Sequence, residues 1–224
     1  MIDLEVLDNE QKILASQITL PKIDISKIET IAGIDTAYFE KDDKEYGVCC
    51  IDVFDINTFD VIEKVSAISE ITFPYISGYL SYRELPVILN AYNKLKSKPD
   101  IFMLDGNGYM HPRHMGIATM FALNENVKSI GVAKTLFKFS SININLDKTL
   151  FSEVPIIINN ELYGYAITTR EGCNPIYVSP GNGISFENAL DIVKKCIGKG
   201  SRIPIPTRVA DIDTHSERKK VKSL

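Results

Sequence analysis

The chain has few cysteines and no long hydrophobic run. Only four cysteines occur among 224 residues, no two of them have C-x-x-C spacing, and adjacent Cys49 and Cys50 would point to opposite faces of a strand. A zinc site or a disulfide framework is therefore not expected, which fits a reducing, cytoplasmic location. The sequence shows no signal peptide and no apolar run long enough to cross a membrane, so we expect no membrane association.

The chain also lacks an excess of positive charge. Its formal net charge is −4, so the overall charge does not favour nucleic acid, although a local basic surface could still bind it. We find no internal repeat, low-complexity segment or domain boundary, and a hydrophobic content of 45% supports a sizeable core. We therefore predict a single domain over residues 1–224, with a basic, frayed C-terminal tail from about residue 214.

Hydrophobic periodicity predicts an α/β fold with one mixed sheet. A helix in the first 30 residues places Ile13, Leu14 and Ile18 on one face. An antiparallel meander of three strands follows, and helices then alternate with short apolar strands, as in mixed α/β sheets. The predicted strands cover residues 31–38, 46–54, 61–68, 101–105, 129–133, 155–158, 162–169 and 176–178.

Three further helices are predicted, two between these strands and one after the last strand. The first follows Ser81 and Glu84, which have the spacing of a capping box. The second runs from Pro112 to about Leu123, and the third follows Gly183. Residues 137–153 are predicted to be irregular, because no periodicity extends through them.

One stretch, residues 101–113, concentrates residues that carry chemistry. A short apolar strand ends in Asp105, a Gly-Asn-Gly turn follows, and His111 and Arg113 flank the proline that opens the next predicted helix. The end of such a strand lies at the rim of a sheet, where open α/β sheets bind their ligands. The alternative is a strand-turn-helix connection built from ordinary turn residues.

Three acids occupy positions that suggest a metal site. Asp35 is the only charge in a strand that otherwise looks buried, Glu84 starts a helix, and Asp105 ends a strand. Clustered carboxylates suit Mg²⁺ or Mn²⁺, and such a site can hydrolyse a phosphodiester by activating water. Each residue also has an ordinary explanation. Asp35 could pair with a buried lysine, and Glu84 could cap its helix with Ser81. His111 could be a core histidine with a satisfied hydrogen bond. Lys134 could be a solvent-facing strand end.

Six ordered segments resemble the endonuclease V family, which recognises hypoxanthine, the product of adenine deamination. The resemblance runs from Ile31 to about Asp211. The segments are IAGIDTAY from Ile31, PYISGYLSYRE from Pro74, LDGNGYMHPR from Leu104, IGVAK from Ile130, CNPIYVSPG from Cys173 and PIPTRVAD from Pro204.

The resemblance implies a ribonuclease H-like fold and a nuclease of DNA repair that depends on Mg²⁺ or possibly Mn²⁺. The implied substrate is DNA containing deoxyinosine, or inosine-containing RNA, cut at the second phosphodiester bond 3′ to the lesion by a monomer. By matching position, the metal-site acids would be Asp35, Glu84 and Asp105, with His111 and Lys134 in the catalytic centre. A wedge between strands would be formed by Pro74, Tyr75, Ile76 and Ser77. Other residues that contact nucleic acid or the lesion would be Gly78, Gly106, Asn107, Gly108 and Gly116, and Arg113 and Asp211 would be accessory.

The chain departs from the family pattern outside the acids. Asn107 replaces the usual histidine and Ser77 the usual proline; Ala118-Thr119-Met120 replaces Ala-Ser-His, and Gly181-Asn182-Gly183 replaces Gly-His-Arg. These changes fall on the base pocket, the wedge and a nearby loop, so base preference and the choice between DNA and RNA stay open. The alternatives are a non-catalytic nucleic-acid-binding protein and another nuclease on the same fold. The retained acids and Lys134 favour an enzyme, because a binding protein does not need them.

Overall fold

The computed structural model describes residues 2–137 and 144–222 and contains one eight-stranded mixed sheet. The strand order is β3-β2-β1-β4-β5-β8-β7-β6. The strands are β1 (Thr30–Lys41), β2 (Lys44–Asp55), β3 (Val61–Glu70), β4 (Ile101–Asp105), β5 (Ser129–Ala133), β6 (Glu153–Ile158), β7 (Glu161–Ile167) and β8 (Ile176–Asn182). The helices are α1 (Leu4–Ala15), α2 (Leu80–Tyr92), α3 (Ile117–Glu125), α4 (Phe186–Lys195) and α5 (Ile205–Lys222), with a short 3-10 turn at Ile25–Lys27.

The sheet confirms the predicted mixed architecture. Strands β1, β2 and β3 form an antiparallel meander. Strands β1, β4 and β5 run parallel in the centre, and β8, β7 and β6 add an antiparallel edge. The carboxyl ends of the three parallel strands therefore meet at one edge of the sheet, where ligand sites of such sheets lie.

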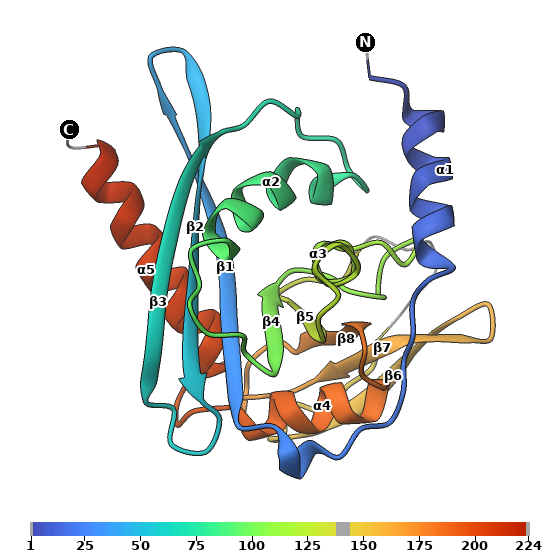
Figure 1. Cartoon of the computed structure of the whole chain (residues 1–224). Coiled ribbons are helices and arrows are strands. Elements are labelled where there is room, and N and C mark those ends of the chain that lie inside the picture. The colour runs from blue at the N-terminus through green and yellow to red at the C-terminus, as the bar shows by residue number, and fades with distance from the viewer. Residues whose placement is uncertain (1, 138–143, 223–224) are drawn as a thin grey trace.

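Alternating side chains of β4 supply two hydrophobic cores, one on each face of the sheet. Ile101 and Met103 pack in the core that contains the inner residues of α4. Phe102 and Leu104 pack in the core under α2 and α3. Figure 1 shows α5 crossing the β1–β3 meander on one side while α2 lies on the other. A strand buried on both faces reads as a continuous apolar run, which is why the sequence reveals β4 so clearly.

Helix α5 begins directly on β1 at a glycine. A side chain added at Gly33 would lie 2.0 Å from the carbonyl oxygen of Pro206. The contact requires a residue without a Cβ, so Gly33 allows the first turn of α5 to rest on the strand backbone. The helix then crosses the face of the meander that is opposite to α2.

The predicted frayed tail is wrong within the part of the chain that the structure describes. Helix α5 continues through residue 214 to Lys222. The hydroxyl of buried Thr214 donates a hydrogen bond to the carbonyl of Asp35 in β1 at 3.4 Å, and Arg218 donates to the carbonyl of Tyr38 at 3.4 Å. These contacts with the sheet hold the basic helix in place, because tertiary packing and not local charge decides most helix stability.

Two predicted helix starts are also wrong. Helix α3 begins at Ile117 and not at Pro112, because the imidazole Nδ1 of His111 accepts the backbone N–H of Met115 at 3.3 Å and His114 has a left-handed φ of 56°. Helix α2 has no capping box. Its N-cap is Tyr79, which makes no side-chain capping bond.

The predicted inner face of the first helix is wrong at Ile13, whereas Leu14 and Ile18 are half-buried. Ile13 of α1 is 65% exposed, whereas Gln11 is fully buried. The inner face of α1 therefore combines buried Gln11 with half-buried Leu7, Asp8 and Leu14, and apolar periodicity alone could not reveal it. Of the predicted irregular segment at 137–153, residues 138–143 lie outside the described residues. Within the described ranges, no helix is both long and apolar enough to span a membrane.

Candidate active site

The strand register places Asp35 and Asp105 next to each other. Ile34 of β1 pairs with Leu104 of β4 in the parallel register, and each aspartate immediately follows one member of this pair. Ile34 and Leu104 both pack under α2 and α3. Because side chains alternate along a strand, both aspartates lie on the other face, toward α5.

Lys134 lies between acids at the same edge. It directly follows β5, whose Val132 pairs with Asp105. Its Nζ atom is 2.5 Å from Oδ2 of Asp105 and 3.4 Å from Oδ1 of Asp211. Partial burial lowers the pKa of Lys134, but its hydrogen bond to Asp105 and the neighbouring acid charges outweigh burial and raise the pKa above its usual value. Lys134 is therefore a charged ammonium group and not an unpaired strand end.

Helix α5 adds Asp211 and a residue that sequence reasoning missed, His215. Ligand atoms of Asp35, Asp211 and His215 all lie within 4.8 Å of one another. Asp211 and His215 are four residues apart on one helix, so they share a face. This spacing is visible in the sequence, but the expectation of a frayed tail concealed it.

Glu84 reaches the site from α2. It is buried, and the hydroxyl of Tyr38 donates a hydrogen bond to its Oε1 at 2.5 Å. Burial raises the pKa of Glu84 to about 7; the bond from Tyr38 opposes the shift, and the charge of Asp105 adds to it. Because Glu84 bonds Tyr38 and α2 has no capping box, its role as a capping partner of Ser81 is excluded.

Burial and the neighbouring acids both disfavour negative charge on Asp35. Burial, followed by the charges of Asp105 and Asp211, raises the pKa of Asp35 well above its usual value, and Lys134 only partly opposes this shift. Oxygen ligands held close together at mutual electrostatic cost are the donor set that Mg²⁺ and Mn²⁺ prefer. The residues present therefore fit a divalent cation.

A cavity of about 240 Å³ lies beside this edge. Of the residues expected at the wedge and the base pocket, Tyr75, Ser77, Gly78, Gly106, Asn107 and Gly116 line it, together with His111. Pro74, Ile76 and Gly108 do not line it. The amide of Gly108 instead donates to Oγ of Ser179 at 3.1 Å. The sequence could not separate these residues, because only the turn of the loop decides which of them face inward.

His111 has a defined neutral form. Its Nδ1 accepts backbone N–H groups from Arg113 and Met115, each at 3.3 Å, and its Nε2 lies 3.1 Å from the carbonyl of Gly78. Because a carbonyl only accepts, Nε2 must carry the proton. Burial, followed by the charge of Arg113, lowers the pKa of His111 to about 4, so the ring is neutral near pH 7.

The departures from the family pattern occupy three regions: the cavity wall, helix α3 and the end of β8. Ser77 and Asn107 line the cavity. Met120 is buried in α3, and Asn182 accepts the backbone N–H of Thr19 at 2.8 Å at the end of β8. Two of the departures therefore alter the cavity wall directly, whereas the other two serve packing and the chain connection near α1.

A scan of protein families matches residues 12–212 to the endonuclease V model. Endonuclease V of Bacillus thuringiensis subsp. konkukian is 46% identical over 198 residues, which cover 88% of this chain and 84% of that protein. The crystal structure of endonuclease V from Bacillus subtilis superposes with a TM-score of 0.95 at 41% identity, covering 100% of this chain and 95% of that one.

A more distant structure contains nucleic acid. Endonuclease V of Ciona intestinalis was solved in complex with a 24mer DNA containing an inosine followed by a ribo-adenosine. It superposes with a TM-score of 0.86 at 27% identity, covering 97% of this chain and 98% of that chain. The shared mixed α/β fold is ribonuclease H-like, and the family model covers most of the described residues. The chain belongs to the endonuclease V family of nucleases.

Proposed function

We propose that this nuclease cuts nucleic acid at hypoxanthine and hydrolyses the second phosphodiester bond 3′ to the lesion. The substrate would be DNA containing deoxyinosine, with inosine-containing RNA as a second possibility. The inosine-containing DNA bound by the Ciona relative supports this substrate class. The retained acids and Lys134 support hydrolysis rather than binding alone.

The observation that carries the proposal is the position of the acid cluster next to the cavity. Asp35, Asp105 and Asp211 meet around Lys134 at the sheet edge. The cavity lies at the same edge, with Gly106 and Asn107, the residues after Asp105, in its wall. A base held in the cavity would thus keep the neighbouring backbone within reach of the acids.

Asp35, Asp105 and Glu84 would hold Mg²⁺ or Mn²⁺, and the geometry adds Asp211 and His215 to the candidate ligands. When bound, the cation supplies an activated water and neutralises charge on the phosphate.

Other residues of the chain would bind and orient the substrate. The Lys134 ammonium would stabilise the negative charge that develops on the scissile phosphate. His111 carries its proton on Nε2 and lines the cavity, so it can hold the wall in place and donate to the Gly78 carbonyl. Tyr75 is 73% exposed at the cavity mouth, where its ring could stack in the gap left by a displaced base.

The test uses end-labelled strands that differ only by one inosine in place of adenine. Wild-type protein with Mg²⁺ or Mn²⁺ should cut only the inosine strand, and the product length identifies the bond. Chelation of the metal should stop the reaction. Asp42→Asn is a matched control for acid variants, because Asp42 is exposed in a hairpin turn with a φ of 53° that asparagine tolerates.

Two other outcomes would contradict the proposal. Binding without cleavage would indicate a non-catalytic binding protein, and equal cleavage of both strands would indicate a nuclease without this base preference. A single domain, a monomeric state and a cytoplasmic location also remain predictions. The oligomeric state can be measured by sedimentation.

A further inference from the structure

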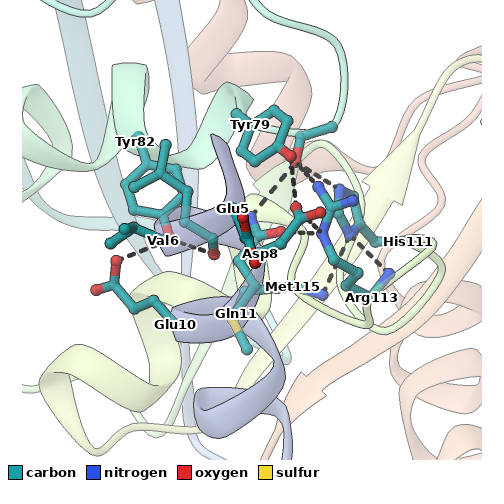
Figure 2. Close-up of polar contacts among 12 residues, drawn as sticks. Glu5, Val6, Asp8, Glu10, Gln11, Tyr79, Tyr82, His111, Arg113 and Met115 are labelled. Carbon is teal, nitrogen blue, oxygen red and sulfur yellow. Dashed lines mark hydrogen bonds and ion pairs between the residues drawn. The ribbon is translucent and has the colours of Figure 1, made fainter. Parts of the chain in front are cut away.

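The most buried residue of helix α1 is polar, and polar side chains supply the directional contacts of the helix with the protein. Its exposed residues include Leu4, Val6 and Ile13, whereas Gln11 is completely buried. Figure 2 shows Asp8, Glu10 and Gln11 pointing toward tyrosine and arginine side chains of other segments. Hydrogen bonds impose distance and direction, which apolar contact does not, so this helix is docked in a defined orientation.

Arg113 is the residue through which α1 holds the loops. Its Nε donates to Oε1 of Gln11 and lies 3.3 Å from Oδ1 of Asp8. The same guanidinium donates to the carbonyl of Gly78 at 2.9 Å and lies over the ring of Tyr79, 4.6 Å from its centre. The Tyr79 hydroxyl in turn donates to Asp8. One side chain thus joins α1, the loop before α2 and the His-Pro-Arg segment (Figure 2).

The shared acceptor of this network is the carbonyl of Gly78. It receives His111 at 3.1 Å, Arg113 at 2.9 Å and the amide of Gln11 at 3.4 Å. Gly78 has a φ of 84°, a left-handed conformation that other residues rarely adopt. A glycine without such contacts would sample many backbone conformations. The three donors to its carbonyl therefore restrict this turn to one conformation.

The fixed turn belongs to the cavity wall. Gly78 lines the cavity with Tyr75, Ser77 and His111, whereas α1 contributes no lining residue. Among the described residues, no hydrogen bond or ion pair joins α1 to Asp35 or Asp105. The helix therefore contacts residues of the cavity wall on their side away from the cavity and, in the part of the chain that the structure describes, makes no polar contact with Asp35 or Asp105.

We propose that α1 is a positioning element for the base pocket, with Gln11 and Asp8 as its positioning residues. The helix sets the turn at Gly78 and thereby the position of Tyr75 and Ser77 at the pocket mouth. This inference rests on the proposed function for its kinetic consequence. Loosening α1 should weaken productive binding of the inosine strand, while the reaction of bound substrate stays nearly unchanged.

The test compares three variants of α1. Gln11→Leu removes the polar groups at constant size, Gln11→Glu retains an acceptor for Arg113, and Ile13→Ala changes an exposed residue of the same helix. The KM for an inosine-containing duplex should rise about tenfold in Gln11→Leu, the scale of one lost charged hydrogen bond. The kcat should stay within about twofold. Gln11→Glu should restore only part of the loss, because it keeps the acceptor for Arg113 but lacks the amide that donates to the Gly78 carbonyl, and Ile13→Ala should match wild type.

A second readout does not depend on activity. The chain has no tryptophan, so Tyr75→Trp introduces a single fluorophore at the pocket mouth. Its fluorescence anisotropy should fall when Gln11→Leu is added and should not fall with Ile13→Ala. If wild-type protein failed to cut inosine strands but the anisotropy still separated the variants, the proposed function would be wrong and the positioning role would stand.

The inference would be overturned if Gln11→Leu and Ile13→Ala had the same anisotropy and the same KM. It would also be overturned if Gln11→Leu changed the anisotropy of the Tyr75→Trp probe but left KM unchanged. If Gln11→Leu does not fold, Asp8→Asn is measured in its place. That variant removes the charge that faces Arg113 but keeps the size of the side chain. The anisotropy and the KM of Asp8→Asn are then compared with those of Ile13→Ala in the same way.

Discussion

Asp35 and Asp105 are neighbours because each follows one residue of the register pair Ile34–Leu104 in adjacent parallel strands. A shift of one residue in the register would turn one of the two carboxylates to the other face of the sheet. The apolar side chains of β1 and β4 fix the register, since they must fill the cores on both faces. Packing of the sheet thus fixes the geometry of the candidate metal site.

Asp105→Asn should abolish cleavage of inosine-containing strands and leave binding of those strands largely intact. The neutral amide is a poor ligand for a divalent cation but has nearly the shape of the carboxylate. Cleavage is measured in single-turnover reactions and binding by anisotropy of a labelled strand. Asp42→Asn serves as the control, and a near wild-type rate for Asp105→Asn would remove Asp105 from the mechanism.

Lys134→Ala should lower turnover by about a hundredfold, the scale of removing one electrostatic contact to a transition state. The ammonium is already held at the acid cluster by Asp105 and Asp211, so it needs little reorganisation. Lys44→Ala, which removes an exposed ion pair with Glu70, is the matched control. A loss confined to affinity for undamaged duplex would make Lys134 an ordinary backbone contact.

Tyr75→Ala should slow cleavage of an inosine-containing duplex more than cleavage of an inosine-containing single strand. Unstacking a base costs a few kcal/mol in a duplex and less in a single strand, so a stacking ring matters more for the duplex. Phe73 stacks on Tyr82 and Tyr79 contacts the same ring at a tilt, whereas Tyr75 is 73% exposed. Packing of Tyr75 in the core is therefore not its main role.

Ser77→Pro should be tolerated or should mildly favour duplex cleavage, because proline restricts the free loop before binding. The quantity to compare is the ratio of duplex to single-strand rates for wild type, Tyr75→Ala and Ser77→Pro at one metal and salt concentration. An unchanged ratio in all three proteins would exclude a wedge at this loop.

His111 should make folding less favourable in acid. Burial and the charge of Arg113 lower its pKa from 6.5 to about 4. The folded state thus prefers the neutral ring, and this stabilisation is complete above the unfolded pKa and lost as pH falls through the folded pKa. The full effect corresponds to roughly 3 kcal/mol.

The measurement is the free energy of unfolding in urea at about pH 7.5 and about pH 4.5 for wild type and His111→Gln. The difference between the two proteins should shrink in acid. The raised pKa values of Asp35 and Glu84 act in the opposite direction, because protonation favours their folded state. Both proteins contain these acids, so their effect cancels, and a difference independent of pH would contradict the prediction.

The sequence predicted the sheet well where local pattern and packing agree. Strand β4 is apolar throughout because both its faces are buried, and Asp105 marks its end. The predicted start of helix α3 was wrong because a side chain, and not the helix backbone, accepts the hydrogen bonds of the preceding amides. The ring of His111 accepts backbone amides and delays α3, and no periodicity records that bond.

The sequence singled out the acids of the candidate site on the central strands, but it did not single out the histidine that α5 contributes. Asp35 and Asp105 stand out because charges are rare in buried strands. His215 does not stand out in the sequence. It reaches the site only because α5 packs on β1 from Gly33 onward, and that contact joins segments far apart in the sequence. The role of Gln11 was hidden for the same reason.

The contact between α5 and β1 also has a consequence for biosynthesis. Asp35 is translated early, whereas Asp211 and His215, which share its cluster, belong to α5. A growing chain can pair β1, β2 and β3 long before α5 exists, because these strands are consecutive. The complete carboxylate cluster cannot form until residue 211 has been translated and α5 has docked on β1, so the candidate site is assembled late in synthesis.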